Sequence, residues 1–436
     1  MKKFFLAISA VLLSAALSAQ ALVESVSLCV NSGDGIYAKG DTVRVWADVK
    51  TAPSVPVTFK VLRWCDWKAE SETPVTLKEG RTLLFERVFN ESVQYVFELT
   101  DGKAPREFKA KGAAGNVFAG IVVSPEEFKP GFEQPADLYE YWSKEIKAMR
   151  KKKIKPVITK DQVKDGYRVY HVDINCVGPA PARAYVAYPE NAQKGTLPII
   201  INLHAAGRPG APSTAGAALS YARIVKGGAL AMDINAHGMP DDQSKEFYDE
   251  LSNGELKGYS TREPEGLEDY YFKWMMLRAE RAVDYLTSNP LWDGRHIIVT
   301  GTSQGGYQSA WLAGIDPRIT AAILTVPAGL DQGATLQGRP ASWPKTINKY
   351  KEQSIKYLPY MDPAAFLKNT KADIWCEIGL YDFTCPAANL FAVLNTCTGE
   401  KTIVTYQRPH SIAFNKEAHK GIDRQRKEFF QKAAAK

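Results

Sequence analysis

Cysteines and long apolar runs are scarce in this sequence. Its 436 residues contain six cysteines, too few for a disulfide scaffold of this length. After residue 21 no stretch reaches the ~18 consecutive apolar residues of a membrane-spanning helix, so we expect no membrane span in the mature chain. The 32 glycines and 25 prolines follow no period, which excludes collagen-like and coiled-coil proteins.

Patterns for metals, cofactors and nucleic acids are also missing. The six histidines are dispersed, and neither Cys-x-x-Cys nor His-Glu-x-x-His occurs. No dinucleotide or phosphate loop is present, so we expect neither a metal nor a cofactor. The formal net charge is +7. It falls to near +5 without the two lysines of the leader described below, and so weak an excess does not indicate a nucleic-acid partner.

The composition is that of a globular protein. Hydrophobic residues make up 45% of the chain, charged residues 24% and aromatic residues 11%. This supply of apolar side chains is sufficient for a packed core and excludes disorder over most of the chain. At ~150 residues per domain, the length predicts two or three domains.

Residues 1–21 have the pattern of a cleaved secretory signal peptide. Lys2 and Lys3 form a basic start, residues 4–17 are apolar except for two serines, and Ala-Gln-Ala at 19–21 is a cleavage site. We therefore expect an exported protein, periplasmic or extracellular. In that oxidising compartment a disulfide between Cys29 and Cys65 is one expectation, and buried free thiols are the other.

Residues 22–120 read as an all-β domain. Segments of alternating character at 42–49, 57–62 and 92–99 are separated by glycine-containing turns, which predicts a small sandwich of immunoglobulin-like kind. The segment contains no catalytic cluster. We expect it to pack against the next domain, with carbohydrate or partner binding as alternatives. Residues 121–165 form a connector that includes an amphipathic entry helix at 136–149.

Residues 166–436 alternate between apolar strands and helices. This order predicts a mostly parallel sheet with helices on both faces, the α/β class. The expected helices lie at 274–286, 307–313 and 387–396, and the expected strands at 197–203, 228–234, 296–300, 319–326, 374–379 and 401–406.

The motif Gly-Thr-Ser-Gln-Gly-Gly at 301–306 lies between an expected strand and an expected helix. Gly-x-Ser-x-Gly in this context is a nucleophile elbow, in which the serine stands on a sharp turn at the end of the sheet. Its glycines are needed because side chains there would collide with neighbouring backbone. We therefore predict that Ser303 is a catalytic nucleophile.

A serine nucleophile needs a base, and the base needs an orienting acid. His410 follows the expected strand 401–406, and Asp382 follows the strand 374–379. The chain order Ser303, Asp382, His410 is that of α/β-hydrolases. His419 is a weaker candidate because it falls in a charged helical tail, where we expect it to be exposed.

An oxyanion requires two backbone donors. One is expected to be the N–H of Gln304, the residue after the nucleophile. The second is expected in the loop that follows strand 197–203, where we predict the N–H of Ala206. His204 in the same loop is interpreted as a structural brace rather than a second base.

These segments together resemble carbohydrate esterase family 7, the acetyl xylan esterase and cephalosporin C deacetylase group. The likeness spans residues 132–411. Besides the serine motif, it rests on Pro-Ala-Asp-Leu-Tyr-Glu-Tyr-Trp at 135–142, Tyr-Tyr-Phe-Lys at 270–273, Val-Pro at 326–327, and Gly-Leu-Tyr-Asp and Cys-Pro within 379–386. The resemblance implies an α/β-hydrolase fold and the roles of nucleophile, acid and base for Ser303, Asp382 and His410.

The sequence departs from the family pattern at two places. Asp-Ile-Asn-Ala-His-Gly at 233–238 stands where the family has Arg-Gly-Gln, and Ser411 stands where the family has Glu after its histidine. His237 is therefore either a pocket residue or a hydrogen-bonding brace. Further pocket candidates are Tyr271, Tyr381 and Trp343, and the insertion 238–269 is a candidate lid.

The resemblance implies an esterase that removes acetyl groups from a polysaccharide or oligosaccharide. Feruloyl or other ester hydrolysis is an alternative because the altered segment at 233–238 reshapes the pocket. A peptidase of the same fold and a catalytically silent binding protein also stay open. The sandwich is an addition to the family pattern, so the family's ring-shaped oligomer is not transferred, and a homo-oligomer stays an open expectation.

Overall fold

A computed structural model describes residues 22, 24–66, 68–102, 116–206, 212–411 and 416–435. The leader predicted at 1–21 lies outside these residues. The chain forms two compact units. The first, the sandwich unit, comprises Met1–Phe128 with Ile378–Phe391 and Thr405–His419. The second, the sheet unit, comprises Lys129–Glu377, Ala392–Val404 and Lys420–Lys436.

The N-terminal part of the sandwich unit is built from two β-sheets, as the sequence predicts. The first sheet orders its strands β1 (Val26–Val30), β3 (Thr42–Val49) and β6 (Gly80–Val88). The second has the order β2 (Ile36–Tyr37), β8 (Val117–Val123), β7 (Val93–Thr100), β4 (Val57–Arg63) and β5 (Ala69–Val75).

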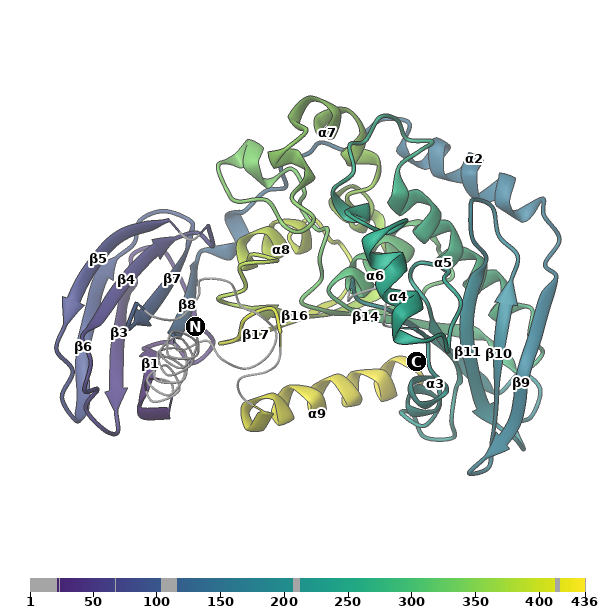
Figure 1. The fold of residues 1–436 in the computed structure, drawn as a ribbon, viewed down its shortest axis with the longest axis horizontal. Helices are drawn as coiled ribbons and strands as arrows, with labels where there is room; N and C mark the ends of the chain where they lie inside the picture. Colours follow the sequence, from purple (N-terminus) through teal and green to yellow (C-terminus); the bar gives the residue numbers. More distant parts are fainter. Residues whose placement is uncertain are drawn as a thin grey trace, which may run out of the picture. The chain divides into compact units, whose positions relative to one another are not determined.

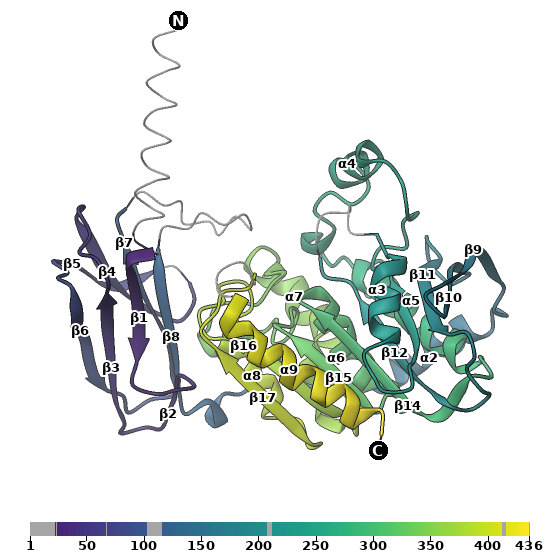
Figure 2. The same ribbon diagram turned by 90° about the horizontal axis from the view of Figure 1, so that it is seen from below.

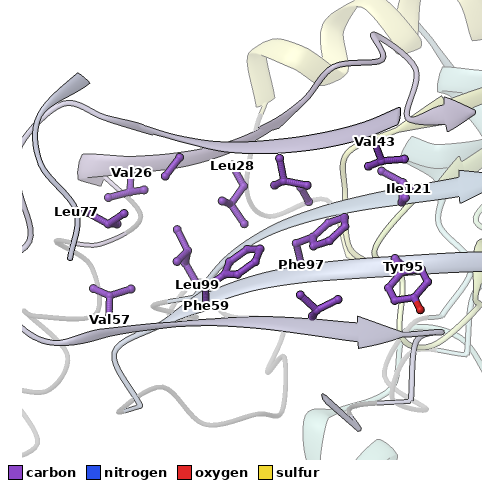
Figure 3. Close-up of a cluster of buried hydrophobic side chains, with 14 of the residues drawn as sticks. Val26, Leu28, Val43, Val57, Phe59, Leu77, Tyr95, Phe97, Leu99 and Ile121 are labelled. Carbon is purple, nitrogen blue, oxygen red and sulfur yellow. The ribbon is translucent and has the colours of Figure 1, made fainter. Parts of the chain in front are cut away.

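Alternation of side chains explains the core between these two sheets. Every second residue of β3 is buried, from Val43 to Val49, because successive side chains of a strand point to opposite faces. These valines meet aromatic side chains of the facing sheet, among them Phe59 and Phe97, whose rings stack 6.1 Å apart. Figure 3 shows these side chains filling the space between the sheets.

Strand β7 differs from its neighbours because all eight of its residues are buried. Tyr95, Phe97 and Leu99 face the sandwich core. The opposite face carries Gln94 and Val96, and Val96 belongs to a second apolar cluster that includes Phe383. The face of β7 that points away from the sandwich core is therefore also covered, in part by Phe383.

The sheet unit contains most of a nine-stranded sheet with the order β17-β16-β15-β14-β12-β13-β11-β10-β9. Pairing is parallel from β13 through β12, β14 and β15 to β16, and antiparallel from β13 through β11 and β10 to β9. The strands are β9 (Pro156–Lys164), β10 (Tyr167–Ile174), β11 (Ala182–Pro189), β12 (Leu197–Leu203), β13 (Leu230–Ile234), β14 (Trp292–Thr302), β15 (Ala321–Thr325), β16 (Asp373–Gly379) and β17 (Lys401–Tyr406).

Helices cover both faces of this sheet, which confirms the predicted α/β class. Helices α3 (Ala215–Ala222) and α9 (Lys416–Ala433) lie on one face, and α5 (Tyr271–Thr287) and α6 (Gln304–Ile315) lie on the other (Figures 1 and 2). The predicted entry helix is α2 (Leu138–Arg150). The indole of its Trp142 packs edge-on against Trp311 of α6 at 4.6 Å.

The central strands β12, β13, β15 and β16 are buried almost throughout. They therefore lack the polar alternation of a half-exposed sheet. None of the helices in the described part of the chain combines the length and apolar character needed to cross a membrane. Of the two alternatives for Cys29 and Cys65, the structure shows free thiols rather than a disulfide, and the Cys29 thiol donates to Asp48 Oδ2 at 3.2 Å.

Candidate active site

Ser303 stands on the turn between β14 and α6, with φ 57° and ψ −119°. A positive φ is strained for a residue with a Cβ and persists only where the surroundings enforce it. Three backbone hydrogen bonds do so here. Ser303 N donates to Thr325 O at 2.9 Å, and Ser303 O accepts from Tyr307 N at 3.0 Å and Ala328 N at 2.9 Å.

The glycines of the motif are required by close backbone contacts. A Cβ on Gly301 would lie 2.3 Å from Gly305 C, and a Cβ on Gly305 would lie 2.0 Å from Leu203 O. A Cβ on Gly306 would lie 2.8 Å from Pro327 Cβ. This geometry confirms the steric reason expected for these glycines and brings the end of β12 against the start of α6.

Gln304, predicted as an oxyanion donor, is the first residue of α6. Its backbone N–H therefore belongs to the unpaired first turn of a helix, where the helix dipole favours negative charge. Its side chain is fully buried and Oε1 accepts from Tyr259 OH at 2.6 Å. This contact fixes the side chain away from solvent and leaves the backbone donor in place.

Ala206, the second predicted donor, is half-buried in the loop after β12. His204 anchors this loop, because its Nε2 pairs with Asp233 Oδ1 at 2.8 Å and its carbonyl accepts from Gln308 Nε2 at 3.1 Å. Both contacts fit the interpretation of His204 as a brace. Residues 207–211, the remainder of the loop, lie outside the described residues.

Asp382 and His410, the predicted acid and base, lie together in the sandwich unit. His410 Nδ1 is 2.8 Å from Asp382 Oδ2. The other carboxylate oxygen accepts from Thr384 N at 2.8 Å and Cys385 N at 2.9 Å. The carboxylate is fully buried, whereas the His410 side chain keeps 24% of its exposure. A buried acid that holds one imidazole nitrogen fixes the orientation of the ring, as a general base requires.

His419 lies near this pair, against expectation. It is 5% exposed, its ring lies 6.4 Å from that of Tyr406, and Arg408 Nη1 is 3.5 Å from its Nε2. The prediction of an exposed His419 is wrong because the charges of α9 cover only part of the helix surface, and His419 lies on the buried part. Arg408 Nη2 also donates to His410 O at 2.8 Å.

Two of the four pocket candidates contact each other in the sheet unit. His237 Nδ1 is 2.7 Å from Tyr271 OH, and the His237 ring lies 4.7 Å from that of Tyr259. Tyr259 therefore links the two residues: its ring contacts His237, and its hydroxyl donates to the side chain of Gln304, the residue after the nucleophile. Tyr259 belongs to a 3₁₀ turn, η2 (Tyr259–Thr261), within the insertion predicted as a lid.

Burial, with Arg278 nearby as the next cause, lowers the pKa of His237 to about 3. The ring is therefore neutral at neutral pH. Its Nε2 is buried and has no hydrogen-bond partner among the residues that the structure describes. A neutral imidazole with one unused nitrogen can donate to or accept from a bound polar group.

The other two candidates lie elsewhere. Trp343 packs edge-on against Phe272 at 5.9 Å in the sheet unit. Tyr381 belongs to the sandwich unit, where its ring stacks on Phe118 at 5.6 Å. The structure thus brings His237 and Tyr271 together, sets Trp343 beside their neighbour Phe272, and places Tyr381 on the sandwich.

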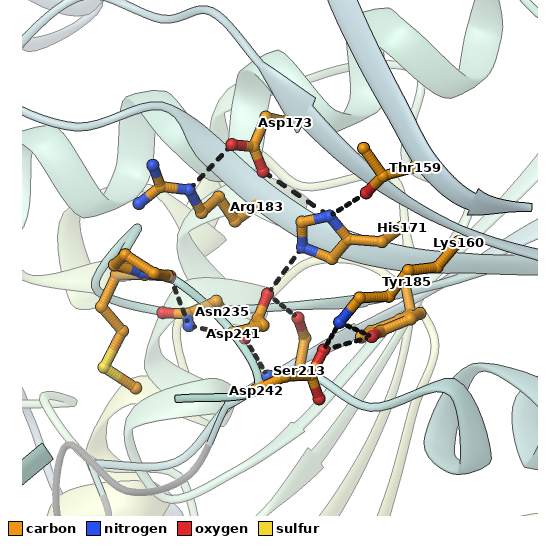
Figure 4. Close-up of polar contacts among 12 residues, drawn as sticks. Thr159, Lys160, His171, Asp173, Arg183, Tyr185, Ser213, Asn235, Asp241 and Asp242 are labelled. Carbon is orange, nitrogen blue, oxygen red and sulfur yellow. Dashed lines mark hydrogen bonds and ion pairs between the residues drawn. The ribbon is translucent and has the colours of Figure 1, made fainter. Parts of the chain in front are cut away.

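A polar cluster that the sequence analysis does not identify supports the segment of His237. Asp241 accepts from Ser213 N at 2.8 Å and Ser213 Oγ at 2.6 Å, and from Asn235 Nδ2 at 3.0 Å. His171 Nε2 is 3.1 Å from the same carboxylate, as Figure 4 shows. The acidic pair at 241–242 after an apolar strand was the available signal.

One group among the described residues has the composition of a metal site. Ligand atoms of Asp382, Cys385 and His410 all lie within 4.8 Å of one another. However, Asp382 Oδ2 is engaged with His410 and Oδ1 accepts two backbone N–H groups. The hydrogen-bonding of this carboxylate fits an acid–base pair better than a cation site.

Comparisons with known proteins identify similar esterases. The family model for acetyl xylan esterase (AXE1) matches residues 124–433. The acetyl esterase Axe7A of Xylanibacter ruminicola is 26% identical over 341 residues, which cover 76% of this chain and 74% of that protein.

Solved structures share the fold. An acetyl xylan esterase from Paenibacillus sp. R4 is 22% identical with a TM-score of 0.58, and covers 70% of this chain and 98% of its own. Acetyl xylan esterase 1 from Thermoanaerobacterium sp. JW/SL YS485 is 20% identical with a TM-score of 0.57 and the same coverage of both chains.

Proposed function

The chain belongs to the acetyl xylan esterase family and is a carboxylic ester hydrolase with acetylesterase activity, and from this premise we propose how it acts. It is an exported enzyme that removes acetyl groups from a polysaccharide or oligosaccharide through an acetyl-enzyme intermediate. Ser303 is the nucleophile, His410 the general base and Asp382 the acid that orients it. The bound partner is the acetylated carbohydrate.

In the first half of the reaction, Ser303 Oγ attacks the acetyl carbonyl carbon and passes its proton to His410 Nε2. The negative charge that develops on the carbonyl oxygen is stabilised by the backbone N–H groups of Gln304 and Ala206. His410 then protonates the departing sugar oxygen, which leaves an acetyl ester on Ser303. In the second half, His410 takes a proton from water as the water oxygen attacks that ester. The bond to Ser303 Oγ then breaks, His410 returns the proton to Ser303 Oγ, and acetate is released.

The backbone of Ser303 is the observation that carries this proposal. A non-glycine residue held at φ 57° by three backbone hydrogen bonds is strain of the kind found at functional sites. The acid–base pair supports it with a 2.8 Å hydrogen bond. The three residues follow the strands β14, β16 and β17 of one sheet, and ligand sites of α/β sheets lie beyond the carboxyl ends of strands.

The substrate and the export are supported by the relatives and by the leader. The names of the matched family and of two solved structures specify acetylated xylan. Residues 1–21 have the charge and apolar pattern of a signal peptide. The amino-terminal sequence of the protein recovered from a periplasmic extract tests this part, because a retained leader contradicts export with cleavage.

The catalytic part is tested with the mature chain and two serine variants. We expect Ser303→Ala to lower kcat for acetate release from acetylated xylo-oligosaccharides and from 4-nitrophenyl acetate by about 10⁴-fold or more. Ser309→Ala is the matched control on the same helix, because the Ser309 hydroxyl donates only to Gly305 O at 2.9 Å. Its kcat should stay within a few-fold of the parent value.

Three outcomes separate the alternatives. Acetate release that disappears only in Ser303→Ala supports the proposal. Equal activity of Ser303→Ala and the parent chain would mean that another nucleophile acts. Release of ferulate or of peptide fragments without release of acetate would overturn the acetyl preference but would not contradict the assignment of Ser303 as the nucleophile.

A further inference from the structure

Two segments that carry the proposed acid and base pack on the N-terminal sandwich. We call residues 378–391 the acid loop and residues 405–419 the base segment. Residues 378–391, which include Asp382, and residues 405–419, which include His410, belong to the same compact unit as the two-sheet sandwich. The segments begin at the ends of two strands of the nine-stranded sheet, and side-chain and backbone contacts join them to β7 and β8 of the sandwich. The sandwich therefore contacts the two segments that carry the acid–base pair.

The side chain of Gln94, on β7, makes the most specific of these contacts. It is fully buried. Its Nε2 donates to Leu380 O at 3.0 Å and to Cys65 Sγ at 3.0 Å, and its Oε1 accepts from Ala388 N at 3.0 Å. A buried amide is costly unless its groups are paired, and here both ends of the amide are engaged.

The two backbone partners of Gln94 bracket Asp382. Leu380 lies two residues before it, and Ala388 lies six residues after it, in the first turn of α8 (Ala387–Leu394). The loop between them supplies the N–H groups of Thr384 and Cys385 that fix Asp382 Oδ1. Holding both ends of this loop thus holds the carboxylate that pairs with His410.

Close packing on β8 reinforces the same loop. A Cβ on Gly120 would lie 2.2 Å from Leu380 O, so only glycine permits this approach. Phe118 stacks on Tyr381 at 5.6 Å and meets Phe383 edge-on at 6.0 Å. The residues on either side of Asp382 therefore pack on the same strand.

The base segment is held in a similar way. The side-chain amide of Gln407, three residues before His410, pairs with the backbone of Gly120. Gly120 N donates to Gln407 Oε1 at 2.8 Å, and Gln407 Nε2 donates to Gly120 O at 2.8 Å. Strand β8 thus contacts the acid loop and the base segment at one glycine.

From these contacts we propose that the N-terminal sandwich positions the acid–base pair, with Gln94 as its principal positioning residue. The proposal rests on the proposed function, since it assumes that Asp382 and His410 serve catalysis. Gln94 does not touch substrate. It acts through the loop at 380–388, so its removal should lower kcat by misorienting Asp382 while leaving KM nearly unchanged.

A double-mutant cycle tests this role in the full chain. Gln94→Met keeps the length of the side chain and removes all three of its hydrogen bonds. We expect kcat on 4-nitrophenyl acetate to fall by about 10- to 100-fold, with KM within about threefold of the parent value. Asp382→Asn alone should lower kcat by about 10³- to 10⁴-fold. In the Asp382→Asn background, Gln94→Met should cost less than about twofold, because residues that act through one another are not additive.

Two further variants separate positioning from a general loss of structure. Gln94→Glu keeps the acceptor for Ala388 N and loses the bond to Leu380 O, so its kcat should lie between those of the parent and Gln94→Met. Tyr95→Phe is the matched control, because Tyr95 is the next residue of β7, faces the sandwich core, and loses only side-chain bonds to Glu70 and Arg87. Its kcat should be unchanged. Circular dichroism at the assay temperature establishes that each variant is folded.

Each outcome has a distinct meaning. Equal losses from Gln94→Met in the parent and the Asp382→Asn backgrounds, or no loss in either, would overturn the positioning role while the proposed function stands. An Asp382→Asn enzyme as active as the parent would refute the proposed acid, and the positioning role with it. If Gln94→Met does not fold, the same cycle with the half-buried Gln407→Met decides the question.

Discussion

His237 shows at the scale of one residue how this chain departs from its family pattern. It stands in the segment that replaces Arg-Gly-Gln, and burial keeps its ring neutral, with a pKa lowered to about 3. Tyr271 holds one ring nitrogen at 2.7 Å. His237 therefore places in this segment a neutral group that can exchange a hydrogen bond in either direction.

This burial makes stability depend on pH. In the unfolded chain the imidazole takes up a proton near its ordinary pKa of 6.5, whereas in the folded chain it resists protonation down to about 3. The unfolded state therefore binds more protons between these values, and the free energy of unfolding contributed by His237 falls as the pH falls. The stability is fully present above pH 6.5 and is lost at about 1.4 kcal/mol per pH unit below it.

We predict that His237→Gln removes this slope. The difference in free energy of unfolding between parent and variant, from urea titrations at pH 4.5 to 8, should be constant above pH 6.5 and decrease below it. Burial raises the pKa of Asp362 to about 7, with Asp331 as the next cause. The free energy of unfolding contributed by Asp362 therefore rises as the pH falls, opposite to the contribution of His237. Because Asp362 is present in the parent and in the variant, its contribution cancels in the difference. Parallel stability curves would contradict a buried, neutral His237.

At the scale of elements, the polar cluster around Asp241 joins two loops that follow neighbouring strands. Ser213 comes from the segment after β12, Asn235 from the segment after β13, and His171 from β10. The Asp241 side chain is 1% exposed and accepts from all three. A buried carboxylate with this many donors holds the loops in one arrangement.

Asp241→Ala should therefore destabilise the protein by about 3 kcal/mol, because it removes the acceptor of the buried Ser213 N–H and hydroxyl and one of the two acceptors of Asn235 Nδ2. Asp242→Asn is the matched control, since the neighbouring carboxylate is 46% exposed and exposed pairs contribute about 1 kcal/mol or less. Urea unfolding measures both values, and amide exchange at Ser213 should accelerate only in Asp241→Ala. Equal losses in the two variants would show that the cluster does not hold the loops.

Local patterns in the sequence are sufficient to predict most elements of the fold. Strands β3, β12 and β17 have the bounds expected from the residue pattern, because apolar alternation and apolar runs are local signals. The Gly-x-Ser-x-Gly motif and the order of serine, acid and histidine predict the candidate site for the same reason. The antiparallel extension β9 is exposed along its whole length, so it lacks the apolar pattern that identifies a strand.

Contacts between distant segments lie beyond such patterns. Gln94 and Leu380 are 286 residues apart, and nothing near either residue specifies the other. Tyr381 has the sequence context of a pocket aromatic, yet its ring stacks on Phe118. Periodicity indicates that a face is buried and does not indicate what covers it. This is why the sequence predicts the sandwich but not the segments that pack on it.

At the scale of the whole molecule, the contacts of the sandwich unit predict that loss of activity follows unfolding of the sandwich. The outer face of β7 is covered by the acid loop through Gln94 and Phe383. Unfolding of the sandwich would therefore expose that apolar cluster and release the loop that fixes Asp382. Elements that share a buried cluster unfold together.

We expect thermal loss of acetylesterase activity to coincide with loss of the sandwich, observed as near-ultraviolet circular dichroism of its stacked aromatic side chains and as amide exchange along β7. A Val96→Ala variant creates a cavity in the shared cluster and should lower both midpoints together by several degrees, since removal of buried methyl groups costs about 1–3 kcal/mol. Val45→Ala removes the same methyl groups from the sandwich core on β3, away from the shared cluster. It should lower both midpoints as well if the sandwich unfolds as one body with its loop. Activity that survives above the sandwich transition would contradict the coupling, because the acid loop would then hold its geometry without β7.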